Sequence, residues 1–388
     1  MIEKYYDGAI EQVAAGLGTV EKNHLLVRYS GQFSIEELSY TDQLEKMENI
    51  FVQMHEFEPG EITSAYEPYL TMICDGFRRY MTGTFEEFME ECDVYYLHRP
   101  VLLGYFNRGY AKREEIILLD EVAYEQERML AALERMLYAI ADRHPVLLIL
   151  NRFQLASKST MQLTARILKA ENSNIGLVLG VSDIQAMPEF LVPDWEMLYE
   201  TLDDGSKIYH IGNSGRKKEE IADDGKYADY GSEKVYRKLQ NMVEFLDFDQ
   251  AAYYLEVIER KIKFDNLFVD DPARFRMWLL FAKVSILRKD IPKALEICED
   301  LEKIHLAGRE DECAYEQDYL IATAYMYQGK LKEALEMAGE TYRIAEKISD
   351  DYRKFLSELL KAQIQMYIFM HMTISRKSSR RRISLKNF

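Results

Sequence analysis

The strand signal in this chain stops abruptly near residue 212, and this change limits the folds open to it. Before that point, short apolar runs suited to strands buried on both faces alternate with stretches whose apolar residues recur every three or four positions, most clearly at 66–81 and 124–143. The alternation predicts an α/β domain over residues 1–212, with a parallel sheet covered by helices. The expected strands are "HLLVRYS" (24–30), "NIFVQMHEF" (49–57), "VLLIL" (146–150), "IGLVLGVS" (175–182) and "KIYHIG" (207–212).

The rest of the chain has three parts. Residues 213–232 are charged, rich in glycine and poorly periodic, so we interpret them as a linker or exposed loop. Residues 233–371 have only helical patterns. Residues 372–388 carry six basic side chains and no acidic one, and we expect a disordered or non-native tail there. A different reading stays open, because "RRIS" (381–384) has the form of a basophilic kinase site and basic tails bind acidic surfaces.

An internal repeat runs through the helical part. Three segments, 246–261, 288–303 and 328–343, each consist of a turn and a helix with a key alanine. Small residues at such places let two helices approach closely, while bulky neighbours fill the gaps between helix pairs. The key alanines are Ala251, Ala294 and Ala334, and the matching residues of the preceding helices are Trp278, Phe281, Ala282 and Ser285, then Ile321, Ala322 and Tyr325.

This pattern resembles the tetratricopeptide repeat, in the longer form of about forty residues found in bacterial regulators. The resemblance implies an all-α tetratricopeptide-like superhelix over 233–371, whose first helices line an inner groove that binds a protein or peptide partner. An ordinary helical bundle is the alternative. The candidate groove residues are Arg276, Lys283, Gln317 and Tyr327, which could equally be ordinary solvated positions.

Three segments of the first part, taken in order, resemble the core of STAND-type signalling ATPases. "FVQMHEFEPGEITSAYEPYLTMICDGFRRY" (51–80) is similar to the segment after the P-loop. "ERMLYAIADRHPVLLILNRFQLASKSTMQLTARIL" (134–168) looks like the Walker B region, and "NIGLVLGVSD" (174–183) like the next core strand, which carries a polar sensor residue. The resemblance covers about residues 8–212 and implies a P-loop-like parallel sheet with a nucleotide site.

The residues that such a site needs are missing. A P-loop wraps phosphates with glycine backbone and a lysine, but the stretch after the first strand offers one glycine, Gly31, and the carboxylates Glu36 and Glu37. Asn151 and Arg152 stand where two acidic residues would hold Mg²⁺ and position water. We therefore expect a degenerate nucleotide site with no catalytic residue and no cofactor.

A weaker alternative keeps ATP and magnesium bound, through Arg152, Lys158 and Asp183 as replacements. Lys158 lies in "ASKST" (156–160), which has no glycine to cradle phosphates, so we interpret Ser157 or Ser159 as a helix cap.

Other functional classes find little support. The net charge of −17 disfavours nucleic acid as a partner, because phosphate binding depends on clustered Lys and Arg. The four cysteines and seven histidines show no metal-ligand spacing, and no apolar run is long enough to span a membrane. We expect reduced, mostly buried thiols and a cytoplasmic protein.

The combined expectation is a non-catalytic signalling or scaffold protein, in which a pseudo-ATPase domain is coupled to a protein-binding repeat array. The alternative is a nucleotide-binding STAND-type regulatory ATPase, such as a fragment of a transcription regulator or cyclase without its output domain. The sequence does not specify the partner, the signal or the oligomeric state.

Overall fold

The computed structural model describes residues 2–19, 24–29, 49–111, 119–170, 172–182, 187–203, 207–211, 230–265 and 267–385. It divides into two compact units. The first comprises Met1–Tyr230 with Arg237–Gln250, and the second Gly231–Tyr236 with Ala251–Phe388. Most of the predicted linker, 213–232, lies outside the described residues.

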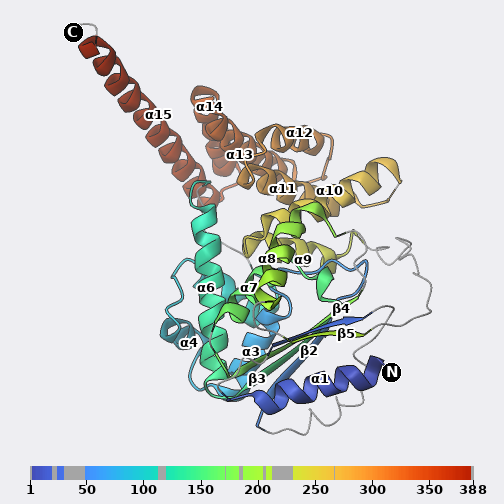
Figure 1. Cartoon of the computed structure of the whole chain (residues 1–388). Helices are drawn as coiled ribbons and strands as arrows, with labels where there is room; N and C mark the ends of the chain where they lie inside the picture. The colour runs from blue at the N-terminus through green and yellow to red at the C-terminus, as the bar shows by residue number, and fades with distance from the viewer. Residues whose placement is uncertain are drawn as a thin grey trace. The chain divides into compact units, whose positions relative to one another are not determined.

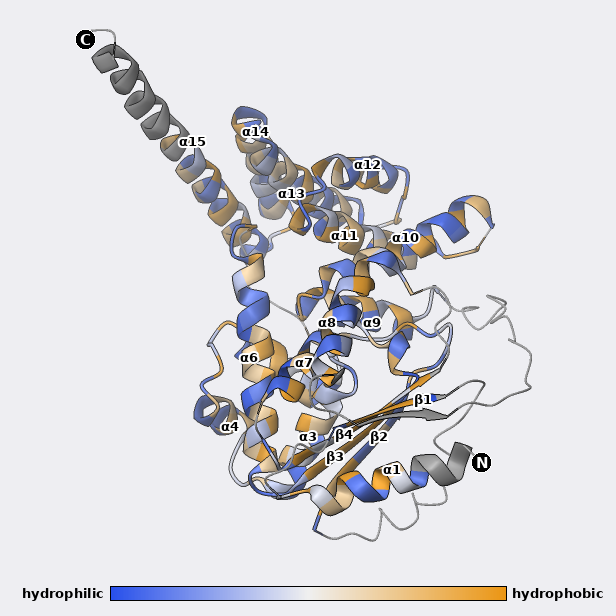
Figure 2. Ribbon diagram, in the orientation of Figure 1, coloured by the Kyte–Doolittle hydropathy of each residue, from blue (hydrophilic) through white to orange (hydrophobic). Residues whose placement is uncertain are grey.

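The first unit is built on a five-stranded sheet in the order β2-β3-β4-β1-β5 (Figure 1). Every neighbouring pair of strands is parallel, as the alternation of strands and helices predicts. All five expected strands are confirmed: β1 (His24–Tyr29), β2 (Phe51–Glu56), β3 (Val146–Asn151), β4 (Ile175–Ser182) and β5 (Lys207–Ile211). Strands β1, β3 and β4 appear mostly in the hydrophobic colour in Figure 2, because both faces of the sheet are covered there.

Helix α1 (Ile2–Gly16) covers one face of the sheet. Its buried residues Ile10 and Val13 pack against β1, β3 and β4. Gly176 of β4 lies under this helix, and a Cβ added there would approach Val13 Cγ1 to 2.6 Å. The close fit explains a glycine in the middle of a buried strand.

The other face carries helix α3 (Tyr69–Tyr80), as the predicted helical stretch at 66–81 requires. A Cβ added to Gly76 of α3 would come within 3.0 Å of Phe51 in β2 and 2.9 Å of Ile140 in α6, so both elements pack tightly on α3. The further helices of this unit are α4 (Phe85–Glu91), α5 (Arg99–Arg108), α6 (Val122–Ala141), α7 (Lys158–Lys169) and α8 (Val192–Asp203).

The first unit extends further along the chain than the expected 1–212. It includes most of α9 (Glu233–Glu244) and the start of α10 (Phe248–Phe264). The side chain of Asn241 accepts a hydrogen bond from the Ala111 backbone N–H at 2.9 Å and donates to the Gly109 carbonyl at 3.3 Å. Sequence periodicity does not report such long-range polar contacts.

The second unit is a stack of helices, and the described residues after Ile211 contain no strand. Helix α13 (Glu310–Gln328) packs against α11 (Asp271–Leu287), α12 (Ile291–Leu301), α14 (Leu331–Lys347) and α15 (Asp351–Leu385). The three key alanines are fully buried, as are Ala282 and Ala322, so the predicted close packing of the helices is confirmed.

The turn before each key alanine has the same geometry. A residue with positive φ lies five positions before the alanine: Leu246 (69°), Lys289 (66°) and Gly329 (81°). In each turn the next residue donates its N–H to the carbonyl five positions back, as in a Schellman motif. The repeat read from the sequence is therefore also a repeat of backbone conformation.

Helix α15 continues to Leu385 and so includes most of the residues 372–388, for which the sequence predicts a disordered or non-native tail. The segment 351–385 contains neither glycine nor proline. Once a helix is nucleated by packing, each further residue adds a backbone hydrogen bond at little cost, so a basic composition alone does not end it.

Candidate functional site

The carboxyl ends of β1, β4 and β3 meet at one edge of the sheet, where Tyr29 of β1 lies opposite Ser182 of β4. The chain leaves β1 for the edge strand β2 and leaves β4 for β5 on the other side of β1. In open α/β sheets, ligands bind at the strand ends where connections diverge in this way. The predicted site residues Gly31 and Asp183 follow β1 and β4 in the sequence, and both lie outside the described residues.

Asn151 ends β3 and is fully buried. Its side-chain oxygen accepts a hydrogen bond from the Arg152 backbone N–H at 3.0 Å, and its carbonyl accepts one from the Phe57 N–H at 3.1 Å. Asn151 therefore accepts hydrogen bonds from two backbone N–H groups at the C-terminal end of β3. A buried neutral amide in this position adds no negative charge to balance a magnesium ion, as a carboxylate would.

Arg152 follows in a left-handed conformation (φ 52°, ψ 40°). Its guanidinium lies 3.2 Å from a Glu56 carboxylate oxygen and 3.3 Å from one of Glu58, and its side chain is only 15% exposed. These carboxylates come from the end of β2 and the residues after it. The charge of Arg152 is thus neutralised within the protein.

Lys158 is also held by carboxylates. Its ammonium lies 2.5 Å from Asp249 and 4.0 Å from Asp194. Burial alone would lower the pKa of Lys158, but the hydrogen bond and charge of Asp249 together with the charges of Asp194 and Asp247 outweigh it, and the pKa lies above its ordinary value. Lys158 therefore stays charged and is paired with carboxylates of the same chain.

The hydroxyl groups of "ASKST" form the start of α7. Ser157 caps the helix by accepting from the Thr160 N–H, so the predicted cap is confirmed. Ser159 Oγ accepts from the Tyr66 N–H at 3.0 Å, and Thr160 Oγ1 donates to the Glu67 carbonyl at 2.8 Å. All three hydroxyl residues are buried, and protein groups occupy the helix end that a phosphate would need.

Asp247 completes this arrangement from the turn between α9 and α10. It is buried, and its carboxylate accepts a hydrogen bond from the Ser159 backbone N–H at 3.0 Å. Burial raises the pKa of Asp247, and the hydrogen bonds from Ser159 and the charge of Lys158 reduce that rise without cancelling it. Sequence reasoning missed Asp247, Asp249 and Asp194, because nothing in the sequence shows which distant acids meet the start of α7.

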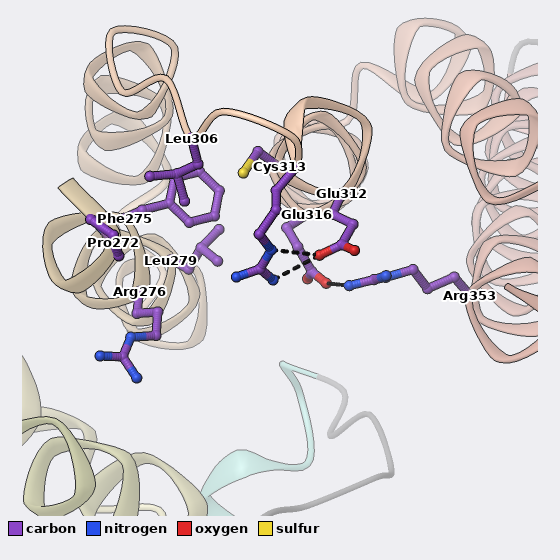
Figure 3. Close-up of a pocket in the computed structure, with 10 residues that line it drawn as sticks. Pro272, Phe275, Arg276, Leu279, Leu306, Glu312, Cys313, Glu316 and Arg353 are labelled. Atoms are coloured by element: carbon purple, nitrogen blue, oxygen red, sulfur yellow. Dashed lines mark hydrogen bonds and ion pairs between the residues drawn. The ribbon is translucent and has the colours of Figure 1, made fainter. Parts of the chain in front are cut away.

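The second candidate site is a cavity of about 390 Å³ in the helical unit (Figure 3). One face of α11 and one face of α13 form its two sides, each with residues at the helical spacing i, i+3, i+4 and i+7. Arg353 of α15 also lines the cavity. The lining residues are Pro272, Phe275, Arg276 and Leu279 from α11, Leu306, Arg309, Glu312, Cys313 and Glu316 from the following loop and α13, and Arg353.

The cavity has an apolar side and a charged side. Figure 3 shows Phe275, Leu279 and Leu306 grouped together, away from the paired charges. Arg353 donates to Glu316 at 2.7 Å, and Arg309 makes two hydrogen bonds to Glu312, at 2.7 and 2.9 Å.

Arg276, on α11, is paired with Glu233 at 2.9 Å. Its guanidinium also lies 4.7 Å from the ring centre of Tyr236. The side chain is 41% exposed, so it is available at the surface while it holds both neighbours.

Of the four predicted groove residues, Arg276 lines this cavity. Lys283 lies further along α11 and is not among its described lining residues. The expectation that Gln317 is an exposed contact is wrong, because it is buried and donates to the Cys298 carbonyl at 3.1 Å. Tyr327 packs against the cores between α13 and its neighbours, with its ring 6.2 Å from that of Tyr367.

Two of the predicted groove residues, Lys283 and Tyr327, lie in the C-terminal halves of α11 and α13. The cavity lies at the N-terminal halves of α11 and α13, where Arg309, Glu312 and Glu316 supply most of its charges. The spacing of these three residues along the sequence could have predicted a charged helix face.

No protein-family model matches the sequence, and no curated protein matches it either.

Within the described part of the chain, no group of three His, Cys, Asp or Glu side chains could hold a metal ion. No helix of the described ranges is both long and apolar enough to cross a membrane. Cys74, Cys92 and Cys298 are buried free thiols, as expected, and Cys313 is partly exposed.

Proposed function

We propose that this protein is a non-catalytic signalling or scaffold protein, in which a pseudo-ATPase domain of STAND type accompanies a tetratricopeptide-like array that binds a protein or peptide. The observation that carries the proposal is the ion pairing of Arg152 with Glu56 and Glu58. At the strand end where a hydrolase needs a metal-binding acid, this chain has a cation whose charge is already balanced.

The order of the strands supports the STAND-type resemblance. A nucleotide site of that kind combines a loop after the first strand, the end of the metal-binding strand and a sensor on the next strand. These parts can act together only if β1 lies beside β4 and β4 beside β3, and this sheet has that order.

The same order favours the alternative function, a regulatory ATPase that still binds nucleotide. Residues 30–48, where a phosphate loop would lie, are outside the described residues. Gly31 is the single glycine of that stretch, and the carboxylates Glu36 and Glu37 follow it closely, which disfavours a triphosphate. Arg152 and Lys158 are already paired with carboxylates, which also disfavours binding of a triphosphate.

The cavity between α11 and α13 is the proposed partner site. Its apolar side suits an aliphatic or aromatic anchor of a peptide, and a few such anchors carry most of the affinity in peptide complexes. Its ion pairs lie at partly exposed positions, where each contributes only about 0–1 kcal/mol to the stability of the fold. Charged groups of a ligand could therefore replace one member of a pair with little loss of stability.

A titration of the full chain with a fluorescent ATP analogue and Mg²⁺ separates the two functions. The scaffold proposal expects no saturable binding and no phosphate release above background. Saturable binding that is competed by unlabelled ATP would support the alternative. For the cavity, peptide-library selection against the full chain should yield ligands that depend on residues of α11 and α13.

A further inference from the structure

Helix α15 has two different faces. One face packs against the cores of the helical unit through Leu360 and Ile364, which are buried, and through Tyr367 and Ile368. Large apolar side chains are exposed on the opposite face, with Tyr352 51% and Phe355 61% exposed, followed by Met366 (46%) and Phe369 (70%).

The exposed face is a regular stripe. With Leu359 and Ala362 in between, its residues follow one another at intervals of three, four, three, four and three. This is the spacing of the a and d positions of a heptad repeat, which marks a helix that packs along a second helix. We call residues 352, 355, 359, 362, 366 and 369 the α15 stripe.

The stripe is large enough to matter energetically. Aromatic side chains bury about 150–250 Å² each, so the exposed fractions of its rings and Met366 leave about 400 Å² of apolar surface open. Two such stripes would supply about 800 Å² of the roughly 1,200–2,000 Å² that a stable interface buries, and flanking side chains would add the rest.

The α15 stripe is complementary to a second copy of itself that runs in the antiparallel direction. If two copies lie antiparallel, Tyr352 comes opposite Phe369, Phe355 opposite Met366, and Leu359 opposite Ala362. Large side chains then meet at both ends, and the small Ala362 allows close approach in the middle. An isologous contact about a two-fold axis requires such a self-matching surface.

Charge decides the direction of pairing. Residues 372–388 carry six basic side chains and no acidic one. A parallel pair would bring the two copies of this segment together and make them repel, whereas an antiparallel pair separates them by the length of the stripe. At the flank of the stripe, Glu358 comes near Gln363 and Gln365 of the other copy, so like charges do not meet there.

We infer that this protein forms a homodimer in which the α15 stripes of two copies pack antiparallel. Light scattering with size-exclusion chromatography of the full chain at micromolar concentration should give about twice the 45.6 kDa of one chain. Phe355→Glu and Phe369→Glu should each give the single-chain mass with an unchanged far-UV circular dichroism spectrum, since both rings are exposed. Phe268→Glu, which alters an 86% exposed ring outside the stripe, should leave the dimer intact. A monomeric wild type, or a dimer that survives both stripe substitutions, overturns the inference.

Cysteine cross-linking tests the direction. In a Cys313→Ser background the remaining native thiols are buried. Tyr352→Cys and Phe369→Cys chains should form a disulfide when mixed under oxidising conditions, and neither should cross-link efficiently alone. Cross-linking of each variant with itself would instead show a parallel pair and contradict the antiparallel arrangement.

Discussion

The carboxylate of Asp247 accepts a hydrogen bond from the backbone N–H of Ser159, 88 positions earlier in the chain, at 3.0 Å. This contact brings the turn between α9 and α10 to the start of α7, beside the ion pair of Lys158 and Asp249. The helix end that could attract an anionic ligand is therefore occupied by the protein's own carboxylates.

Asp247→Ala should lower the free energy of unfolding by about 1–3 kcal/mol, because the Ser159 N–H is left buried without its acceptor. Asp247→Asn should cost less, since its amide oxygen can still accept that bond and no charge is buried. Folding raises the pKa of Asp247 above its ordinary value of 3.8. The wild type therefore loses stability as the pH rises from 3.8 through the pKa of the folded state, whereas the Asn variant should not. Urea unfolding across this pH range checks both effects, and equal losses for Ala and Asn would contradict them.

Arg152→Met should destabilise the first unit by about 1–3 kcal/mol, because it leaves Glu56 and Glu58 without their shared cation. The matched control is Arg343→Met, at a 69% exposed side chain, which should change stability by no more than about 0.5 kcal/mol. Neither variant should change phosphate release from Mg·ATP, which we expect at background level. ATP turnover by the wild type that Arg152→Met abolishes would instead assign the arginine a catalytic role.

Asp318 makes the helical unit sensitive to pH. Burial, together with the charges of Glu340 and Glu302, raises its pKa to about 6. A raised carboxyl pKa means that the folded state loses stability as pH rises from about 4 to about 6. After allowance for solvent screening at this partly exposed site, Asp318→Asn should be more stable than wild type by about 1–2 kcal/mol at pH 7, and equally stable near pH 4.

The control for Asp318 is Glu336→Gln, at a 69% exposed side chain of α14. Its free energy of unfolding should differ from that of the wild type by no more than about 0.5 kcal/mol, because substitutions at exposed positions change stability little. An Asp318→Asn effect that is equally large at pH 4 would mean that packing, and not titration, is responsible.

The cavity should bind its peptide through α11 and α13. Arg276→Glu and Leu279→Asp should each weaken binding of a selected peptide by about tenfold or more, because both side chains line the cavity. Lys283→Glu reverses a charge on the same helix outside the lining residues and should stay within about twofold of wild type. Fluorescence anisotropy with the labelled peptide measures all three, and equal losses would remove the cavity as the binding site.

Thiol labelling should distinguish Cys313 from the other cysteines. Burial raises the pKa of Cys74 and Cys298 to about 12 and that of Cys92 to about 11, so these thiols should react slowly in the native protein. Cys313 is partly exposed and should give the single fast phase with a maleimide. Loss of that phase in Cys313→Ser would confirm the assignment, whereas a remaining fast phase would mean that a buried thiol is accessible.

Local pattern in the sequence determined the elements of this protein. Buried strands need continuous apolar runs, and all five were found where those runs occur. The helical repeat followed from Ala251, Ala294 and Ala334, since only a small side chain fits where two helices touch. The Ser157 cap followed from the preference of a hydroxyl for the first turn of a helix.

Only the tertiary structure decided which charges meet. Arg152 pairs with Glu56 and Glu58, about a hundred positions away, because β2 and β3 are neighbours in the sheet. Gln317 is buried because α12 lies beside α13, although its spacing on the helix fits an exposed position equally well. Hydrophobic periodicity records which face of an element is covered, whereas the partner of a polar side chain depends on elements that approach from elsewhere in the chain.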